Sequence, residues 1–171
     1  TGLSAGGFTD FQVIGASPTW NVALTANAGL MTLLQEFYRQ TAPWGGWDSD
    51  TEGHAAMRAA AAASGQAPNG GYVAGWTWQY PMLALLTEAI ASGDLTHANL
   101  AALAANLEGV DYQGMLPTRS YTGPAAGNVE RSTIINGVDP ASADGVVSVQ
   151  DFFVSDVAAD YEFTDACFVV G

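Results

Sequence analysis

Two short stretches of the sequence are rich in hydroxyl and aromatic side chains. They contain Ser17, Thr19, Trp20, Tyr72 and Trp76. Such side chains supply the apolar walls and the few hydrogen-bonding groups that line small-molecule sites. If the two stretches face each other, they predict a ligand-binding cleft. Packing in an apolar core is the alternative, and it is at least as plausible for the neighbouring Trp78 and Tyr80.

The residue types needed for catalysis do not occur in a recognisable pattern. Neither a Gly-x-Ser-x-Gly elbow nor a Cys paired with a His occurs, and no Gly-x-Gly-x-x-Gly or phosphate-binding loop is found. His54 and His97 lie near predicted helix starts, where a surface or capping role is favoured over that of a general base. We therefore predict no catalytic residue and no cofactor, and expect that the chain is not an enzyme.

One acidic segment has spacing that resembles a metal site. Residues 48–53, Asp-Ser-Asp-Thr-Glu-Gly, imitate the first half of a calcium loop with its Gly at the sixth position. A calcium loop requires a bidentate carboxylate at the twelfth position, which here is Ala59. A helix start is thus favoured and no metal site is predicted. For the flanking Trp44 and Trp47, packing is favoured over a role as lid contacts.

The charge balance excludes some partners. The 171 residues include 4 basic and 17 acidic side chains, a net charge of −13, and none of the basic residues is a lysine. Binding to nucleic acid depends on Lys and Arg that contact phosphates, so we predict no nucleic-acid partner. An anionic membrane surface is disfavoured for the same reason. With 49% hydrophobic residues the chain can bury a core, and no run reaches the length of a membrane span.

The elements that would position these residues alternate between strands and helices. Residues 11–15 read as a buried strand, and the hydroxyl-rich segment 16–21 follows its carboxyl end, where open α/β sheets place ligands. A helix N-cap is the equally plausible alternative for that segment. Ser49 and Glu52 form a possible capping box for a helix that ends near Gly65.

Further along, residues 72–90 predict a helix buried on most sides that Pro81 kinks or interrupts. Thr96 can cap the next helix, which Gly109 ends. Residues 132–135 and 146–154 predict a hairpin, and the seven acids of the last 33 residues indicate a solvated surface. For residues 22–39, helix and strand both fit the apolar pattern, and the strand would span Leu30 to Phe37.

Four blocks in order resemble a known family. They are residues 13–21 (VIGASPTWN), 71–76 (GYVAGW), 93–96 (GDLT) and 114–121 (GMLPTRSY). Together they resemble the carboxyl-terminal half of a type 1 periplasmic binding protein, with the branched-chain amino-acid (Leu/Ile/Val) group the most similar. The resemblance implies an α/β fold of two three-layer lobes, of which this chain is a carboxyl-terminal portion.

On this resemblance, residues 1–37 and 126–171 belong to the carboxyl-terminal lobe and residues 38–125 to the amino-terminal lobe. The resemblance also favours the strand interpretation of Leu30 to Phe37, as a crossover between lobes. The chain is then expected to be a fragment, or to pair with a separate chain that carries the amino-terminal half. No secretion signal begins at Thr1, so any leader would lie upstream.

The resemblance also implies a function and a site. It implies a solute-binding subunit of an ABC importer, periplasmic or extracellular, including the case of a lipid anchor upstream, with the importer's membrane subunits as partners. Ser17, Thr19 and Trp20 match the segment that contacts the ligand's amino end, and Tyr72 and Trp76 match the opposite wall. The resemblance implies a small amino-acid-like or organic-acid ligand. Because no carboxylate accompanies Ser17, a free amino acid is disfavoured, and a neutral, aromatic or acidic ligand fits instead.

Two other functions and one covalent bond remain open. A sensing domain of a receptor or regulator can use the same fold, and an enzyme on a related scaffold would require a perturbed acid or histidine in the cleft. Cys167, the single cysteine, is expected either to be a buried thiol or to pair with a cysteine of the absent half.

Overall fold

The computed structural model describes residues 2–164, with only the backbone at 125 and 126, so Cys167 lies outside the described residues. The strands are β1 (Val13–Ala16), β2 (Tyr38–Ala42), β3 (Thr133–Val138) and β4 (Val146–Phe153). The α-helices are α1 (Gly2–Ala5), α2 (Ala28–Phe37), α3 (Glu52–Ser64), α4 (Gly70–Thr77), α5 (Tyr80–Ser92), α6 (His97–Ala105) and α7 (Asp156–Asp160). Three 3₁₀ helices accompany them: η1 (Ser17–Thr19), η2 (Val22–Ala26) and η3 (Ala125–Asn128). The predicted mixed α/β class is confirmed.

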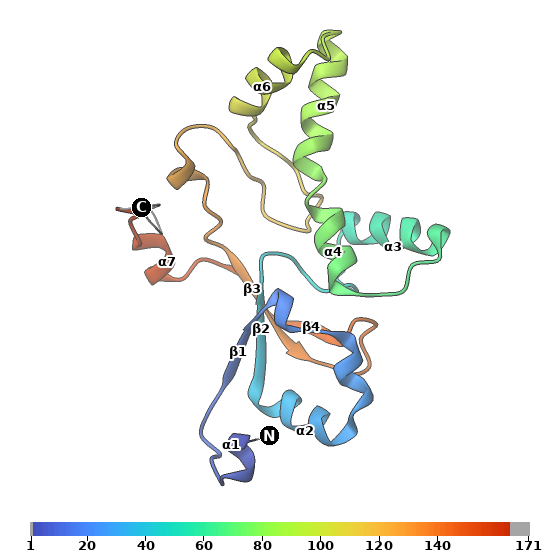
Figure 1. Cartoon of the computed structure of the whole chain (residues 1–171), viewed down its shortest axis with the longest axis vertical. Coiled ribbons are helices and arrows are strands. Elements are labelled where there is room, and N and C mark those ends of the chain that lie inside the picture. The colour runs from blue at the N-terminus through green and yellow to red at the C-terminus, as the bar shows by residue number, and fades with distance from the viewer. Residues whose placement is uncertain (1, 165–171) are drawn as a thin grey trace, which may run out of the picture.

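The four strands form a single mixed sheet in chain order. β1 pairs with β2 in parallel, β2 with β3 antiparallel, and β3 with β4 antiparallel. β3 and β4 are the predicted hairpin, whose turn is closed by a hydrogen bond from the Asp139 N–H to the Gly145 carbonyl. We call residues 13–42 and 133–153 the sheet region (Figure 1).

The ambiguous segment 22–39 is resolved as helix followed by strand. Asn27 caps α2 because its side chain accepts a hydrogen bond from the Leu30 N–H, and the helix continues to Phe37. The strand interpretation of Leu30 to Phe37 is therefore wrong: the chain enters the sheet only at Tyr38. The apolar pattern misled because a short apolar run suits a helix and a buried strand equally well.

Residues 52–121, which include α3 to α6, form a helical region with its own core. Met57 of α3, Val73 of α4 and Met115 of the loop after α6 are completely buried there. The helix ends follow local signals: Gly65 and Gly93 adopt the left-handed conformation after α3 and α5, and Thr96 caps α6 as predicted. α3, however, is capped by Thr51, whose hydroxyl accepts from the His54 N–H, and not by Ser49.

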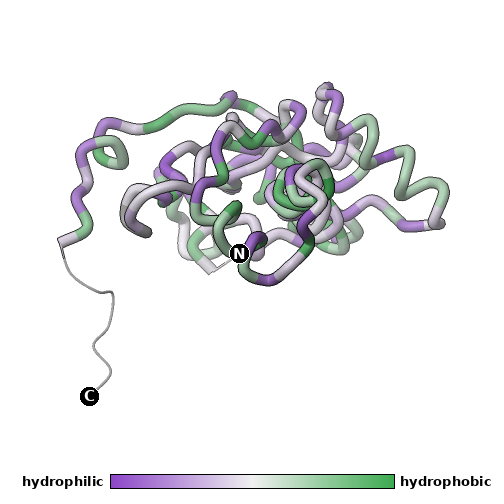
Figure 2. The backbone as a smooth tube through the Cα atoms, turned by 90° about the horizontal axis from the view of Figure 1, so that it is seen from above, coloured by the Kyte–Doolittle hydropathy of each residue, from purple (hydrophilic) through white to green (hydrophobic). Residues whose placement is uncertain are grey.

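The predicted helix over 72–90 is divided into α4 and α5, with Pro81 in the first turn of α5. The expected interruption is confirmed, but burial on most sides is wrong for α5. Met82, Leu83 and Ile90 are all at least half exposed. Figure 2, a view along the long axis of the molecule, shows hydrophobic and hydrophilic stretches interspersed along the backbone. α6 ends at Ala105, before the predicted stop at Gly109. No helix among the described residues is long and apolar enough to cross a bilayer.

Candidate ligand-binding site

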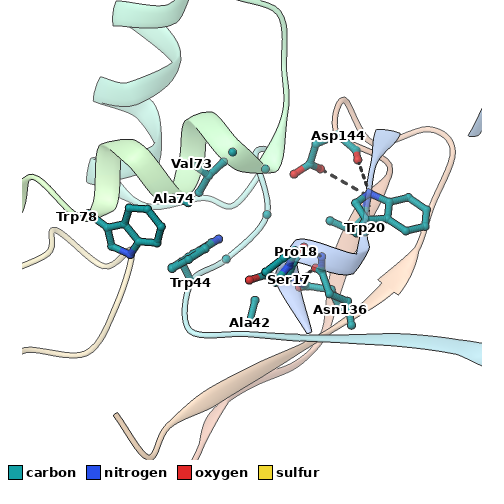
Figure 3. A pocket seen from close by; sticks show the side chains of 16 residues that line it. Ser17, Pro18, Trp20, Ala42, Trp44, Val73, Ala74, Trp78, Asn136 and Asp144 are labelled. Carbon is teal, nitrogen blue, oxygen red and sulfur yellow. Dashed lines mark hydrogen bonds between the residues drawn. The ribbon is translucent and has the colours of Figure 1, made fainter. Parts of the chain in front are cut away.

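A cavity of about 430 Å³ lies between the sheet region and α4. Its size is within the usual range for small-molecule sites. The sheet region contributes Ser17, Pro18, Trp20, Gln40, Ala42 and Asn136. The opposite side is made by Gly70, Gly71, Val73, Ala74 and Trp78 in and after α4, and Trp44 lies between the two sides (Figure 3). Residues far apart in the sequence thus form one lining.

Of the three residues predicted after the first strand, two line the cavity. Ser17, the first residue of η1, and Trp20, which directly follows η1, are in its wall. Thr19 is not among the lining residues: its hydroxyl donates to the Ala16 carbonyl at 2.7 Å and lies 2.8 Å from the Tyr38 hydroxyl. The segment after β1 does border the cavity, as expected for the carboxyl end of a strand.

The second predicted pair, Tyr72 and Trp76, is not part of the cavity lining. Both pack against the core of the helical region, with their rings stacked 6.4 Å apart. An α-helix has 3.6 residues per turn, so residues 70, 73 and 74 share one face while 72 and 76 share another. The prediction identified the helix that forms the opposite wall, but α4 presents Val73 and Ala74 to the cavity instead.

The sequence analysis missed the polar network at the base of the cavity. The Asn136 side-chain amide donates to Gln40 Oε1 at 3.0 Å, and the Gln40 amide donates to the Ser17 carbonyl at 3.3 Å. Asn136 and Gln40 are both buried, on the paired strands β3 and β2. The only signal for this network in the sequence was a polar residue in each strand. That signal is informative only once the pairing register of the strands shows which residues point inward.

Asp144, one of the seven acids assigned to a solvated surface, is in fact 2% exposed and lines the cavity. Its carboxylate accepts from the Trp47 N–H at 2.9 Å and from the Ser142 hydroxyl at 3.1 Å, and its backbone carbonyl accepts from the Trp20 indole at 2.8 Å. Burial raises the pKa of the Asp144 carboxyl, and the hydrogen bond from Trp47 partly opposes that rise. A surface role is therefore wrong for this acid.

Residues 43–51, which we call the connecting loop, join β2 to α3 and carry Trp44 to the cavity. On one side Arg58 of α3 donates to the carbonyls of Trp47 and Ser49, at 2.8 and 3.0 Å. On the other side the Asp48 carboxylate accepts from the Ala143 N–H at 2.7 Å. Trp47 packs in the core and Trp44 packs against it, as predicted. Trp44 also lines the cavity and meets Trp78 edge to face at 5.7 Å.

His54 also holds the connecting loop, and its predicted surface position is wrong because the residue is fully buried. Its Nε2 lies 3.3 Å from the Gly45 carbonyl and its Nδ1 lies 2.7 Å from the Thr51 hydroxyl. A carbonyl only accepts, so Nε2 carries the proton and Nδ1 accepts from Thr51. Burial lowers the pKa of His54, which therefore stays neutral near pH 7.

The acidic segment 48–53 forms the end of the connecting loop and the start of α3. The helix-start interpretation is thus confirmed over that of a calcium loop. Among the described residues, no group of three or more His, Cys, Asp or Glu is arranged to hold a metal ion. The chemistry that the cavity offers is that of binding: aromatic and aliphatic walls with an amide, a hydroxyl and a carboxyl at one side.

The chain was compared with known proteins and structures. Neither a protein-family model nor a curated protein sequence matches it. A solved structure, the fatty acid ABC transporter substrate-binding protein from Thermomonospora curvata, superposes with a TM-score of 0.74 at 21% sequence identity, over 93% of this chain. The chain has a type 1 periplasmic-binding-protein-like fold. It spans 40% of the length of that structure, and the comparison gives no support to the branched-chain amino-acid group in particular.

Proposed function

We propose that this chain is part of an extracytoplasmic solute-binding subunit of an ABC importer and binds a small ligand in the cavity beside α4. The observation that carries the proposal is the cavity itself, since two regions remote in sequence meet there around Trp20, Trp44 and Trp78. The likeness in fold to a transporter substrate-binding protein supports the same role. The membrane subunits of the importer would be its partners.

Binding would proceed by closure of the two sides of the cavity on the ligand. The chain passes between the sheet region and the helical region twice, at residues 43–51 and 122–132. A ligand that contacts both regions favours the closed arrangement by the difference in its affinity for the two states. No bond needs to form or break. The lobe boundaries near residues 37 and 126 stay a prediction.

Within this proposal Ser17 and Trp20 contact the ligand directly. Thr19, Tyr72 and Trp76 would act from behind the walls, Thr19 through Tyr38 and the two aromatic residues through the helical core. The largely apolar lining suits a ligand with substantial apolar surface. An alkyl chain would fit this description, and the solved structure of similar fold is named for fatty acids.

A cavity-filling variant tests the proposal. Ala74 is buried on the cavity face of α4, so Ala74→Phe should occupy the space where the ligand would lie. Compounds that change the tryptophan fluorescence of the wild-type protein should bind the variant at least tenfold more weakly. Ala63→Phe, at an exposed position of α3, provides a matched control that should bind normally. Equal binding by Ala74→Phe and wild type would contradict a ligand site in this cavity.

A further inference from the structure

We infer that the ligand is an uncharged, largely apolar molecule whose polar group is a hydrogen-bond donor, and that the side-chain oxygen of Asn136 receives this donor. The inference rests on the proposed function and narrows the class of ligand. It follows from the orientation of one buried amide, from the charges around the cavity and from the nature of its walls.

The network at the base of the cavity determines which way the Asn136 amide points. The Ser17 carbonyl can only accept, so the Gln40 NH₂ group must face it, at 3.3 Å. Gln40 Oε1 is then the atom that faces Asn136, and it requires a donor. The Asn136 NH₂ group fills that role at 3.0 Å. The remaining atom, Asn136 Oδ1, is therefore an acceptor with a definite orientation.

Asn136 is only 2% exposed, and its Oδ1 is buried without a hydrogen-bond partner among the described residues. A buried acceptor without a partner destabilises the folded protein, because it has lost its hydrogen bond to water and gained none in return. Most buried polar atoms in folded proteins are paired, so an exception in the wall of a cavity indicates a missing partner. Asn136 lines the cavity, although its Oδ1 has almost no accessible surface of its own, so a hydroxyl or amide N–H of the ligand would supply the missing partner once closure of the cavity uncovers this oxygen.

The charges around the cavity disfavour an anionic ligand. No Arg or His is among its lining residues, and the lining includes the carboxyl of Asp144. The four arginines of the described chain are engaged elsewhere, Arg39 and Arg58 with backbone carbonyls, Arg119 with Glu130, and Arg131 with carbonyls in and directly after α7. An anion would lose its hydration without gaining a cation. A neutral donor meets no such penalty.

The remaining walls explain why the rest of the molecule should be apolar. Val73 and Val146 line opposite parts of the cavity, and Trp44 and Trp78 present their rings beside them. The polar groups are gathered on the sheet side, around Ser17, Asn136 and Asp144. A ligand with one donor and an apolar body matches this uneven distribution.

Two matched series of probes test the inference on the complete chain. Octan-1-ol, methyl octyl ether and octanoate share an aliphatic body, and 4-ethylphenol, 4-ethylanisole and 4-ethylbenzoate share an aromatic one. In each series only the first is both neutral and a donor. In at least one series we expect the donor to bind about tenfold more tightly than its ether and its carboxylate, as measured by calorimetry.

The variant Asn136→Leu removes the acceptor and should bring the affinities of the alcohol or phenol and its ether to within about twofold of each other. Asn106→Leu, at an exposed position after α6, is the matched control and should preserve the difference. If Asn136→Leu does not fold, the ratio of the affinities of the wild-type protein for the donor and its ether still tests the inference, because that measurement needs no variant.

Three outcomes would overturn the inference, and they are distinguishable. Equal affinities for donor and ether would show that water satisfies Asn136 Oδ1. Tighter binding of a carboxylate, abolished by Ala74→Phe, would refute the inference and leave the proposed function intact. Absence of binding in both series would count against the cavity as a ligand site, and so against the proposed function as well.

Discussion

The helical region and the sheet region differ in how much core each one builds from its own residues. In the helical region nine buried residues, among them Met57 and Met115, form one cluster with Trp47 of the connecting loop, whereas the sheet region has a cluster of three, Met31, Tyr38 and Val138. On β1, Val13 and Ile14 stay exposed, and Ile14 is 59% exposed. The stability of the helical region thus rests on a larger core. The sheet region has a smaller core, so its stability depends more on contacts with residues outside the region.

The largest expected effect on stability comes from truncating a buried methionine in each of the two cores. Met57 is completely buried, so Met57→Ala should lower the free energy of unfolding by about 2–5 kcal/mol. Met31→Ala removes the same atoms from the smaller cluster, where half-buried Trp20 and Leu34 can relax, and should cost about 2 kcal/mol, at the low end of the same range. Urea unfolding followed by circular dichroism measures both. Equal losses would contradict the difference drawn between the two regions.

A smaller effect is expected from the hydrogen bond that joins Trp20 to the hairpin turn. Trp20→Phe keeps most of the ring but removes the N–H that donates to the Asp144 carbonyl at 2.8 Å, which should cost about 1–2 kcal/mol in urea unfolding. Trp78→Phe is the matched control, because that indole is 65% exposed, and should change stability by less than about 0.5 kcal/mol. If Trp78→Phe lowered the stability and Trp20→Phe did not, the stabilising role assigned to the hydrogen bond of Trp20 would be wrong.

The smallest effect concerns pH. Since burial lowers the pKa of His54 below 6.5, the unfolded chain binds more protons than the folded chain once the pH falls to that range. The contribution of neutral His54 is thus complete above pH 6.5 and is lost as the pH falls through the folded pKa. His54→Gln should make the midpoint of thermal unfolding less dependent on pH between 7.5 and 5, and His97→Gln, at an exposed position, should not. Identical pH profiles for His54→Gln and wild type would refute this.

Burial acts in the opposite direction on Asp144, at the edge of the sheet region. Its carboxyl has a raised pKa, so the folded chain holds this proton to higher pH than the unfolded chain does. The stability contributed by protonated Asp144 is therefore complete at low pH and decreases as the pH rises through the folded pKa. The two regions thus respond to acid in opposite senses at His54 and Asp144.

The sequence predicted best where structure depends on neighbours in the chain. Thr96 and Gly65 act on backbone groups within a few residues, and the two segments of the predicted hairpin pair across a short turn. Even here one cap was misassigned: Thr51 holds the position that Ser49 was expected to hold. Both residues have the right chemistry, and only the backbone conformation distinguishes them.

The cavity was only partly predictable. The segment after β1 and the helix of Tyr72 and Trp76 border the cavity, and both could be recognised in the sequence from a strand end and from aromatic residues. Contact of these elements with a ligand stays a prediction. Which face of α4 turns toward the cavity could not be recognised, since an amphipathic pattern is weak in a helix that is apolar nearly all round. Asn136 and Asp144 belong to strands and turns more than 90 residues from Gln40 and Trp47, their partners.

By itself the sequence determined the composition of the surface charge, the mixed α/β class, the hairpin and most helix ends, because these follow from side-chain chemistry and from contacts over a few residues. Only the tertiary structure decided that Asp144 and His54 are buried, that Leu30 to Phe37 is helical, and that Asn136, a residue of the cavity lining, has a buried oxygen with no partner among the described residues. Burial is the physical reason for the difference. It depends on what the rest of the chain places around a residue, and burial determines the pKa of an acid, the cost of an unpaired oxygen and the role of each in a site.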